Sequence, residues 1–153
     1  MYVRFVNCCK TVATAKPTRR QLQDLAKLRL REAEVLYDAG LYDGSSYLAG
    51  YAVELALKAR ICRLLRLTDY PVNLGSSFRV HDFEQLKVLA GLDSEIDFNK
   101  NAELYDNWSR AILWDPEQRY EPPGRYTAIT AKAILDSIRA KPNGVLTWLS
   151  KRW

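Results

Sequence analysis

Histidine and cysteine are scarce in this chain of 153 residues, which holds one histidine and three cysteines. Cys8 and Cys9 are adjacent and Cys62 stands alone, so the chain has neither a disulfide framework nor a CxxC pair. Such a small set of ligands nearly excludes a metal site built from His and Cys, and we expect no metal and no cofactor. A reduced, cytoplasmic setting is the default for this cysteine usage, and Cys62 is expected to be a small core residue.

Long apolar runs are also missing. No stretch of about 18 apolar residues occurs, so we expect no helix that spans a membrane. The first ten residues carry Arg4 and Lys10 without a sustained apolar core, which does not resemble a signal peptide. We assign residues 1–17 to an N-terminal leader, for which a flexible segment and a short strand at residues 2–6 both remain open. Residues 18–153 are expected to form a single domain.

Charge is unevenly distributed, although hydrophobic residues at 48% and charged residues at 27% are ordinary for a globular protein. The net charge is +6 over residues 1–81, −6 over residues 82–121 and +5 over residues 122–153. A basic molecule with an acidic middle suits a nucleic-acid surface or self-association through opposite patches. Ordinary solvated helix faces explain the same pattern, so both interpretations stay open.

Helix signals dominate the chain after the leader. Apolar spacing and breaker residues predict about five main helices, at residues 18–39, 43–67, 82–90, 101–113 and 126–140. A short helix ending at Trp153 follows. Thr18, Asp43 and Asp82 are the expected caps at helix starts, and Gly40 stands where a helix end favours glycine. Strand alternation is absent outside the leader, so we expect an all-α, antiparallel up-and-down helical bundle.

The second predicted helix places a carboxylate in the middle of an apolar stripe. At 100° per residue, Glu54 lies on the same face as Tyr51 and Leu57, and Lys58 follows one turn later. A buried carboxylate needs partners or a raised pKa. We therefore expect either an ion pair with Lys58, supported by an arginine from a neighbouring helix, or a polar group that faces a cleft. In the first helix, Arg29 and Glu32 also lie near the centre of the leucine face, which suggests an inner polar layer shared by the two helices.

Two groups of residues are candidates for nucleic-acid binding. Three arginines recur at every third residue and are spaced to follow a phosphate backbone, namely Arg60, Arg63 and Arg66. A second group can hold a phosphate and stack a base, namely Trp114, Arg119 and Tyr120. A solvated helix end explains the first group equally well, and packing of a loop against the bundle explains the second.

Four stretches together resemble the HEPN domain family. The segment YDGSSYLAGYAVELALKARI at residues 42–61 is similar to the second helix of that family, and residues 31–42 resemble its first helix and tight turn. His81-Asp82-Phe83 and the following residues resemble the entry to its third helix. The run from Trp114 to Tyr120 resembles a Trp…Arg-Tyr signature of one bacterial subgroup. The resemblance covers about residues 20–140 and is specific as an ensemble.

This resemblance implies a helical bundle that dimerises. Many HEPN members are ribonucleases, and others are RNA-binding modules or partners of small nucleotidyltransferases. The ribonuclease members carry an arginine and, after four to six intervening residues, a histidine late in the bundle. Here the single histidine, His81, lies too early, and Leu74, Gly75 and Ser76 occupy the upstream positions.

We therefore expect a non-catalytic dimer that binds RNA, a nucleotide or a protein in a toxin–antitoxin or defence system, for example with a nucleotidyltransferase. The protein alone is expected not to cleave RNA appreciably. The alternative is a HEPN ribonuclease with a non-standard active site. Its candidate catalytic residues are His81, Arg119 and Glu54, since acid–base cleavage of RNA usually employs histidine. A nucleotide-binding regulatory protein is a third hypothesis.

Overall fold

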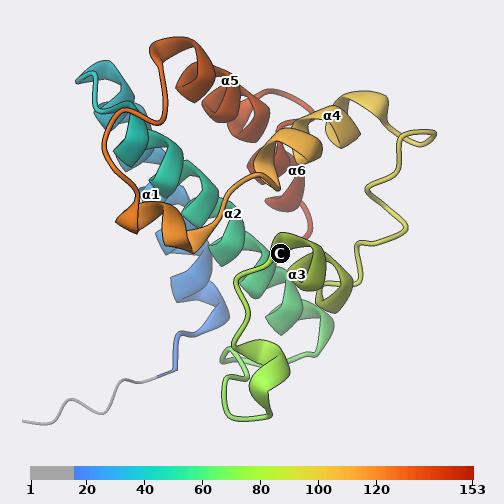
Figure 1. Cartoon of the computed structure of the whole chain (residues 1–153). Coiled ribbons are helices and arrows are strands. Elements are labelled where there is room, and N and C mark those ends of the chain that lie inside the picture. Colours follow the sequence, from blue (N-terminus) through green and yellow to red (C-terminus); the bar gives the residue numbers. More distant parts are fainter. Residues whose placement is uncertain (1–15) are drawn as a thin grey trace, which may run out of the picture.

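The computed structural model describes residues 16–153, which form six α-helices and two short 3₁₀-helices (Figure 1). The helices are α1 (Arg19–Asp38), α2 (Tyr42–Leu64), η1 (Ser76–Phe78), α3 (Phe83–Leu89), α4 (Ala102–Ala111), η2 (Pro116–Tyr120), α5 (Ala128–Arg139) and α6 (Val145–Leu149). Residues 16–153 contain no strand, only an isolated bridge between Thr18 and Asp69. The predicted all-α helical bundle is thus confirmed, whereas the strand considered at residues 2–6 lies outside the described residues.

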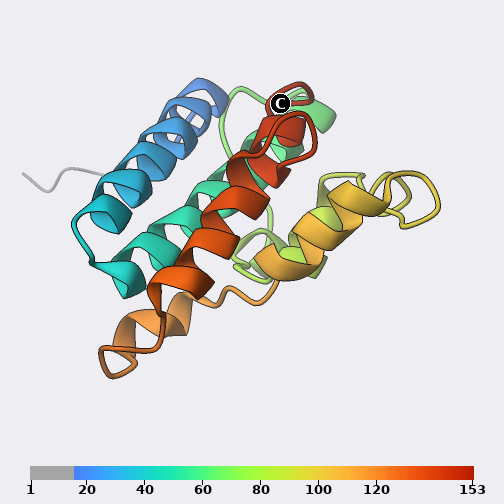
Figure 2. The same ribbon diagram turned by 90° about the horizontal axis from the view of Figure 1, so that it is seen from above.

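Helix α2 is the longest at 23 residues, and it occupies the centre of the bundle. Helices α1, α3, α5 and α6 all pack against it (Figures 1 and 2). Fully buried alanines such as Ala52 and Ala56 let the neighbouring helices approach closely. The pairing with α1 is also fixed by a buried hydrogen bond in which Ser45 Oγ donates to the carbonyl of Ala33 at 2.8 Å. A helix that is apolar on nearly every side is satisfied only in such a central position.

Most of the predicted helix ends are confirmed. Thr18 begins α1 with a capping box in which its hydroxyl accepts from the N–H of Gln21. Asp82 caps α3 by accepting from the N–H of Gln85 at 2.8 Å. Gly40 follows α1 with φ 77°, a left-handed conformation that glycine adopts without steric penalty. Side-chain caps at Thr18 and Asp82 and the backbone freedom of Gly40 act within a few residues, so the sequence reveals these ends.

The prediction that Asp43 caps α2 is wrong. The helix begins at Tyr42 after Leu41, and Asp43 lies inside its first turn. Its carboxylate instead accepts hydrogen bonds from the backbone N–H groups of Gly124 at 2.6 Å and Tyr126 at 2.8 Å. These two hydrogen bonds hold the pKa of Asp43 below its usual value. Asp43 thus ties the segment before α5 to the start of α2, a long-range contact that outweighs local capping.

This tie sets the direction of α5. Helices α1 and α2 are antiparallel, but α5 begins beside the start of α2 and runs along it in the same general direction (Figure 2). The C-terminal residues accordingly reach the far end of α2, where Arg60 donates to the carbonyl of Arg152 at 3.1 Å. The alternation of directions expected for the bundle therefore holds for the first two helices and does not extend to α5.

Cys62 is fully buried, as expected, and burial raises the pKa of its thiol to about 11. Among residues 16–153, no helix combines the length and the apolar character needed to cross a membrane.

Candidate functional site

Glu54 lies on the inner side of α2 and makes three close polar contacts. Its side chain is 2% exposed. Lys58 Nζ lies 2.6 Å from Glu54 Oε1. His81 Nδ1 lies 3.0 Å from both carboxylate oxygens. The predicted inward position of Glu54 and its pairing with Lys58 are confirmed, but His81 from the loop before α3 takes the place expected for an arginine. We refer to Glu54, Lys58 and His81 as the Glu54 cluster.

The contact with Glu54 fixes the chemistry of the His81 ring. A carboxylate only accepts hydrogen bonds, so Nδ1 is the nitrogen that carries the proton in this geometry. The remaining nitrogen, Nε2, is then free to accept a proton when the ring is neutral or to donate one when it is charged. The His81 side chain is 54% exposed, so this nitrogen is within reach of solvent. The arrangement is an oriented acid–base group supported by a buried carboxylate.

The Glu54 cluster borders a hollow of about 320 Å³. Tyr51 and Arg79 also line this hollow, and the ring of Tyr70 lies 5.4 Å from Lys58 Nζ. Burial, and secondarily the negative charge of Glu54, raises the pKa of the Tyr51 phenol, while Arg29 acts in the opposite direction. The hollow thus combines an oriented histidine with the cations of Lys58 and Arg79.

The other predicted members of the inner polar layer form a separate pair. Arg29 Nη1 and Glu32 Oε2 form an ion pair on α1. Within the described chain, neither residue forms a hydrogen bond or ion pair with Glu54 or Lys58. Charges from both pairs act on Tyr51, because Glu54 raises its pKa and Arg29 lowers it. The structure therefore shows two charged pairs on facing helices.

The three arginines of the predicted strip have different surroundings. Arg60 donates to the carbonyls of Ala90 at 3.2 Å and Arg152 at 3.1 Å, so it ties the chain end to α2. Arg63 is exposed and donates to the carbonyl of Trp153 at 3.1 Å. Arg66 is exposed beyond the end of α2. Of these three arginines, Arg63 and Arg66 line the neighbouring hollow at this end of α2, and Arg60 does not.

A hollow of about 560 Å³ lies where the start of α1 meets the end of α2. Four arginines line it, and we call it the arginine hollow: Arg19, Arg20, Arg63 and Arg66. Arg19 and Arg20 were not among the predicted site residues, because they stand more than forty positions away in the chain. Antiparallel pairing of α1 with α2 brings them together. Two acidic residues lie nearby, since Asp24 is 3.9 Å from Arg20 and Asp69 bridges to Thr18.

Arg66 holds a backbone position that normally belongs to glycine. Helix α2 ends at Leu64, three residues earlier than predicted, in a motif where the N–H of Leu67 bonds to the carbonyl of Cys62 at 2.9 Å. Arg66 stands at the left-handed position of this motif with φ 55°. Such a conformation costs a non-glycine residue about 1–2 kcal/mol. Strain of this kind is often retained where a side chain serves a function.

Of the two interpretations of Trp114, the structure shows the packing of its segment against the bundle. Its indole lies against Gly50 so closely that a Cβ at Gly50 would be 2.1 Å from a ring atom. Its Nε1–H donates to the carbonyl of Tyr47 at 2.9 Å, and its ring stacks on Phe83 with centroids 5.2 Å apart. The ring is therefore committed to holding the segment before η2 against α2.

Arg119 and Tyr120 remain on the surface of η2. The guanidinium carbon of Arg119 lies 4.7 Å from the centre of the Tyr120 ring, which is 72% exposed. Arg119 also pairs with Glu117 at 3.4 Å. It lines a hollow that includes Asp43 and is not the one beside His81. The structure thus unites His81 with Glu54 but places the third catalytic candidate, Arg119, in a different site.

Comparison of the chain with protein-family models, curated proteins and solved structures found no match. The HEPN resemblance accordingly rests on the residues of the four stretches alone.

Proposed function

We propose that this chain is a HEPN-like protein that binds RNA, forms a homodimer and serves a partner such as a nucleotidyltransferase in a toxin–antitoxin or defence pair. The observation that carries RNA binding is the arginine hollow. Four arginines line this one concavity, two from the first turn of α1 and two from the end of α2 and the residues after it. A guanidinium group donates two parallel hydrogen bonds to the oxygens of a phosphate, and it retains its charge at any physiological pH. A phosphate backbone is therefore the fitting ligand.

The surroundings of the arginine hollow support this assignment. Asp24 and Asp69 balance part of the charge, but both are exposed and weakly engaged, so a phosphate competes with them readily. The strained backbone of Arg66 keeps a cation where glycine would be more stable. The hollow beside the Glu54 cluster is lined by Pro17 and Leu22, which flank Arg19 and Arg20 in the sequence.

The test is a salt series of single-stranded RNA binding by fluorescence anisotropy. Removal of one phosphate-binding charge lowers the slope of log affinity against log salt by about 0.7 for single strands. The Arg63→Gln/Arg66→Gln variant should therefore lower the slope by about 1.4. The Lys132→Gln/Lys141→Gln variant removes the same charge from exposed positions outside the hollow and should leave the slope unchanged. Equal slopes for the wild type and the arginine variant would refute the proposal.

The Arg66→Gly variant distinguishes an effect on RNA binding from an effect on the stability of the fold. Glycine suits the left-handed position, so this variant should be more stable than the wild type by about 1 kcal/mol. It should nevertheless bind RNA more weakly, with a slope lower by about 0.7. A variant that is both more stable and weaker in binding cannot be explained by partial unfolding. Unchanged binding would mean that Arg66 contacts no phosphate.

RNA cleavage is a second candidate function, favoured by the oriented His81 ring. In this reaction Nε2 of His81 takes the proton of a ribose 2′-hydroxyl, and the 2′-oxygen bonds to phosphorus. The bond from phosphorus to the 5′-oxygen breaks, and that oxygen takes a proton from solvent, which leaves a 2′,3′-cyclic phosphate and a 5′-hydroxyl. Arg79 and Lys58 supply positive charge beside the phosphate. Acid–base groups of this kind contribute about 10²- to 10⁴-fold to rate.

Cleavage is tested on intact RNA with mass spectrometry of the products. If the second function holds, His81→Ala should lower turnover about 10²- to 10⁴-fold without changing the salt slope of binding. Turnover that persists in this variant would mean that a contaminant or another group cleaves the RNA. Absence of turnover in the wild type would leave the protein as a binding module.

The proposed dimer follows from the HEPN resemblance, and α1 offers a surface on which to test it. Leu28 and Val35 are exposed apolar residues seven positions apart on one side of this helix, with the charged residues Arg31 and Glu32 between them. Light scattering of the wild type should give a dimer mass, and Leu28→Glu/Val35→Glu should give a monomer. A concentration-independent monomer mass for the wild type would contradict the proposed dimer.

A further inference from the structure

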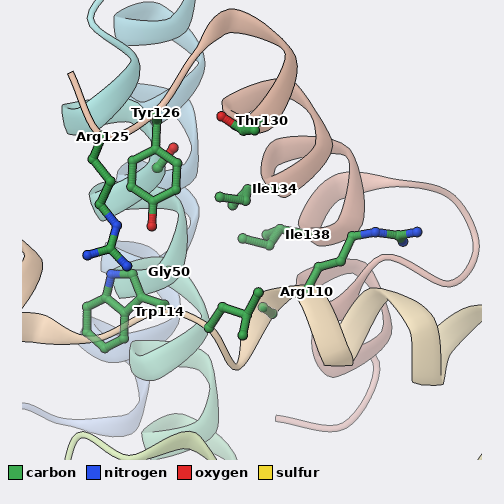
Figure 3. A pocket seen from close by; sticks show the side chains of 11 residues that line it. Gly50, Arg110, Trp114, Arg125, Tyr126, Thr130, Ile134 and Ile138 are labelled. Carbon is green, nitrogen blue, oxygen red and sulfur yellow. The ribbon is translucent and has the colours of Figure 1, made fainter.

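A second kind of hollow lies at the opposite end of α2, between α2, α4, α5 and the segment before α5 (Figure 3). Its volume is about 200 Å³. Its lining is mostly aromatic and aliphatic and includes a serine and an arginine. We call it the aromatic hollow: Ser46, Trp114, Arg125, Tyr126, Ile134 and Ile138. An apolar cavity of about 150 Å³ in another protein binds benzene, so this hollow accommodates one substituted six-membered ring.

Ser46, in the lining of the aromatic hollow, has a buried hydroxyl without a hydrogen-bond partner among the described residues. The residue is 1% exposed, and its Oγ forms no hydrogen bond with any described residue. The neighbouring Ser45 shows the usual outcome, because its hydroxyl donates to the carbonyl of Ala33 at 2.8 Å. Buried hydroxyls without partners are rare, and each one calls for a ligand, a water or another explanation. A polar group placed over the apolar walls satisfies Ser46.

Arg125 provides the charge at the edge of the aromatic hollow. Its guanidinium lies beside the Tyr126 ring, whose centroid is 5.5 Å away, and it forms an exposed ion pair with Glu121. Such surface pairs exchange easily with another anion. Arg110, the other arginine of this hollow, directs its guanidinium away from it (Figure 3). Asp43 accepts a hydrogen bond from the backbone N–H of Tyr126 and does not line this hollow.

We propose that the aromatic hollow binds a small aromatic acid that carries a polar ring substituent. The ring lies between the aromatic side chains and the isoleucines of α5, where its apolar surface leaves water. The substituent meets Ser46 Oγ, and the carboxylate takes the place of Glu121 on Arg125 in a paired hydrogen bond. This site is independent of the arginine hollow, because Ser46 and Arg63 are about 26 Å apart along the axis of α2.

The test pairs two protein variants with three ligands in a calorimetric titration of the full chain. The ligands are 4-hydroxyphenylacetate, phenylacetate without the hydroxyl, and 4-cresol without the carboxylate. For the wild type, 4-hydroxyphenylacetate should bind tightest, about 2- to 10-fold over phenylacetate and about 10- to 100-fold over 4-cresol. Ser46→Ala should abolish the first preference only. Arg125→Gln should abolish the second only.

Matched controls protect this test from folding artefacts. Lys132→Gln removes an equal charge from α5 outside the hollow and should change no preference. Glu121→Gln frees Arg125 and should strengthen binding of both acids, a gain that misfolding cannot produce. Arg63→Gln/Arg66→Gln should bind the acids as the wild type does.

Three results would overturn the proposal. Failure of 4-hydroxyphenylacetate to bind the folded wild type would mean that a water alone satisfies Ser46. Acetate is titrated as a fourth ligand, and its binding as tightly as phenylacetate would reduce the site to a simple anion contact at Arg125. A hydroxyl preference that survives Ser46→Ala would place the ring elsewhere.

Discussion

Glu54 and Ser46 are buried polar residues on the same helix, about 12 Å apart along the axis of α2, yet their surroundings differ completely. Glu54 is 2% exposed and contacts Lys58 and His81. Ser46 is 1% exposed and its hydroxyl contacts no polar partner in the described chain. The buried Glu54 carboxylate stabilises the fold through Lys58 and orients His81. The Ser46 hydroxyl forms no hydrogen bond with the described residues and so stabilises no contact. Burial alone therefore does not indicate function, and the state of the hydrogen bonds does.

The largest loss of stability is expected when the hydrogen-bonded carboxylate of Glu54 is removed. Glu54→Ala leaves Lys58, whose side chain is 13% exposed, without its partner. Removal of one member of a buried ion pair costs about 3–5 kcal/mol. We expect the free energy of unfolding, measured by urea denaturation, to fall by that amount. Replacement of both charges in Glu54→Leu/Lys58→Met should recover most of that stability, because no charge is then left unpaired. A double variant as unstable as Glu54→Ala would contradict this account of the pair.

The next effect concerns the wall of the aromatic hollow. Gly50→Ala places a Cβ 2.1 Å from the Trp114 ring. Overpacking of this kind costs about 1–3 kcal/mol and should also shift the indole fluorescence. In a Trp114→Ala background, Gly50→Ala should leave the free energy of unfolding almost unchanged, because the indole ring that the new Cβ would meet is absent. Equal costs in the two backgrounds, measured by denaturation, would show that the contact does not limit stability.

A smaller, pH-dependent effect is expected at Asp43, the third polar group on this side of α2. Its folded-state pKa lies below the usual value, so its contribution to stability is complete above about pH 5 and is lost as the pH falls through that lower pKa. Asp43→Asn should therefore be less stable than the wild type by about 1 kcal/mol at neutral pH. The difference should shrink in acid. A gap that is constant down to pH 2 would exclude the hydrogen bonds from Gly124 and Tyr126 as its cause.

The smallest effect on stability is expected when the hydroxyl of Ser46, which has no hydrogen-bond partner among the described residues, is removed. Ser46→Ala removes a buried hydroxyl that has no partner, so the free energy of unfolding should stay equal or rise by up to about 1 kcal/mol. Calorimetric melting measures it, and Ser45→Ala is the matched control, because that hydroxyl donates to Ala33 and its removal should destabilise. A clear decrease of stability in Ser46→Ala would mean that its hydroxyl has a partner in solution, which is inconsistent with an empty hollow.

Helix positions and the inward carboxylate were predictable from the sequence because they depend on local spacing. Thr18 and Asp82 bond to N–H groups three residues away, and the pairing of Glu54 with Lys58 spans one helical turn. A spacing of 100° per residue along α2 also placed Glu54 among apolar side chains and so predicted that it faces inward. The contact of His81 with Glu54 was not predictable, because it depends on how the segment between α2 and α3 folds back.

The sequence by itself determined the class of fold, the longest central helix and the charged residue inside it, because apolar periodicity and capping act over a few residues. Only the tertiary structure decided which distant side chains meet. The antiparallel turn after α1 assembles the arginine hollow from both helices, and the Asp43 bonds bring Tyr126 and α5 over Ser46. Such contacts arise when the whole apolar surface of α2 is covered at once, a condition that no local stretch of sequence contains.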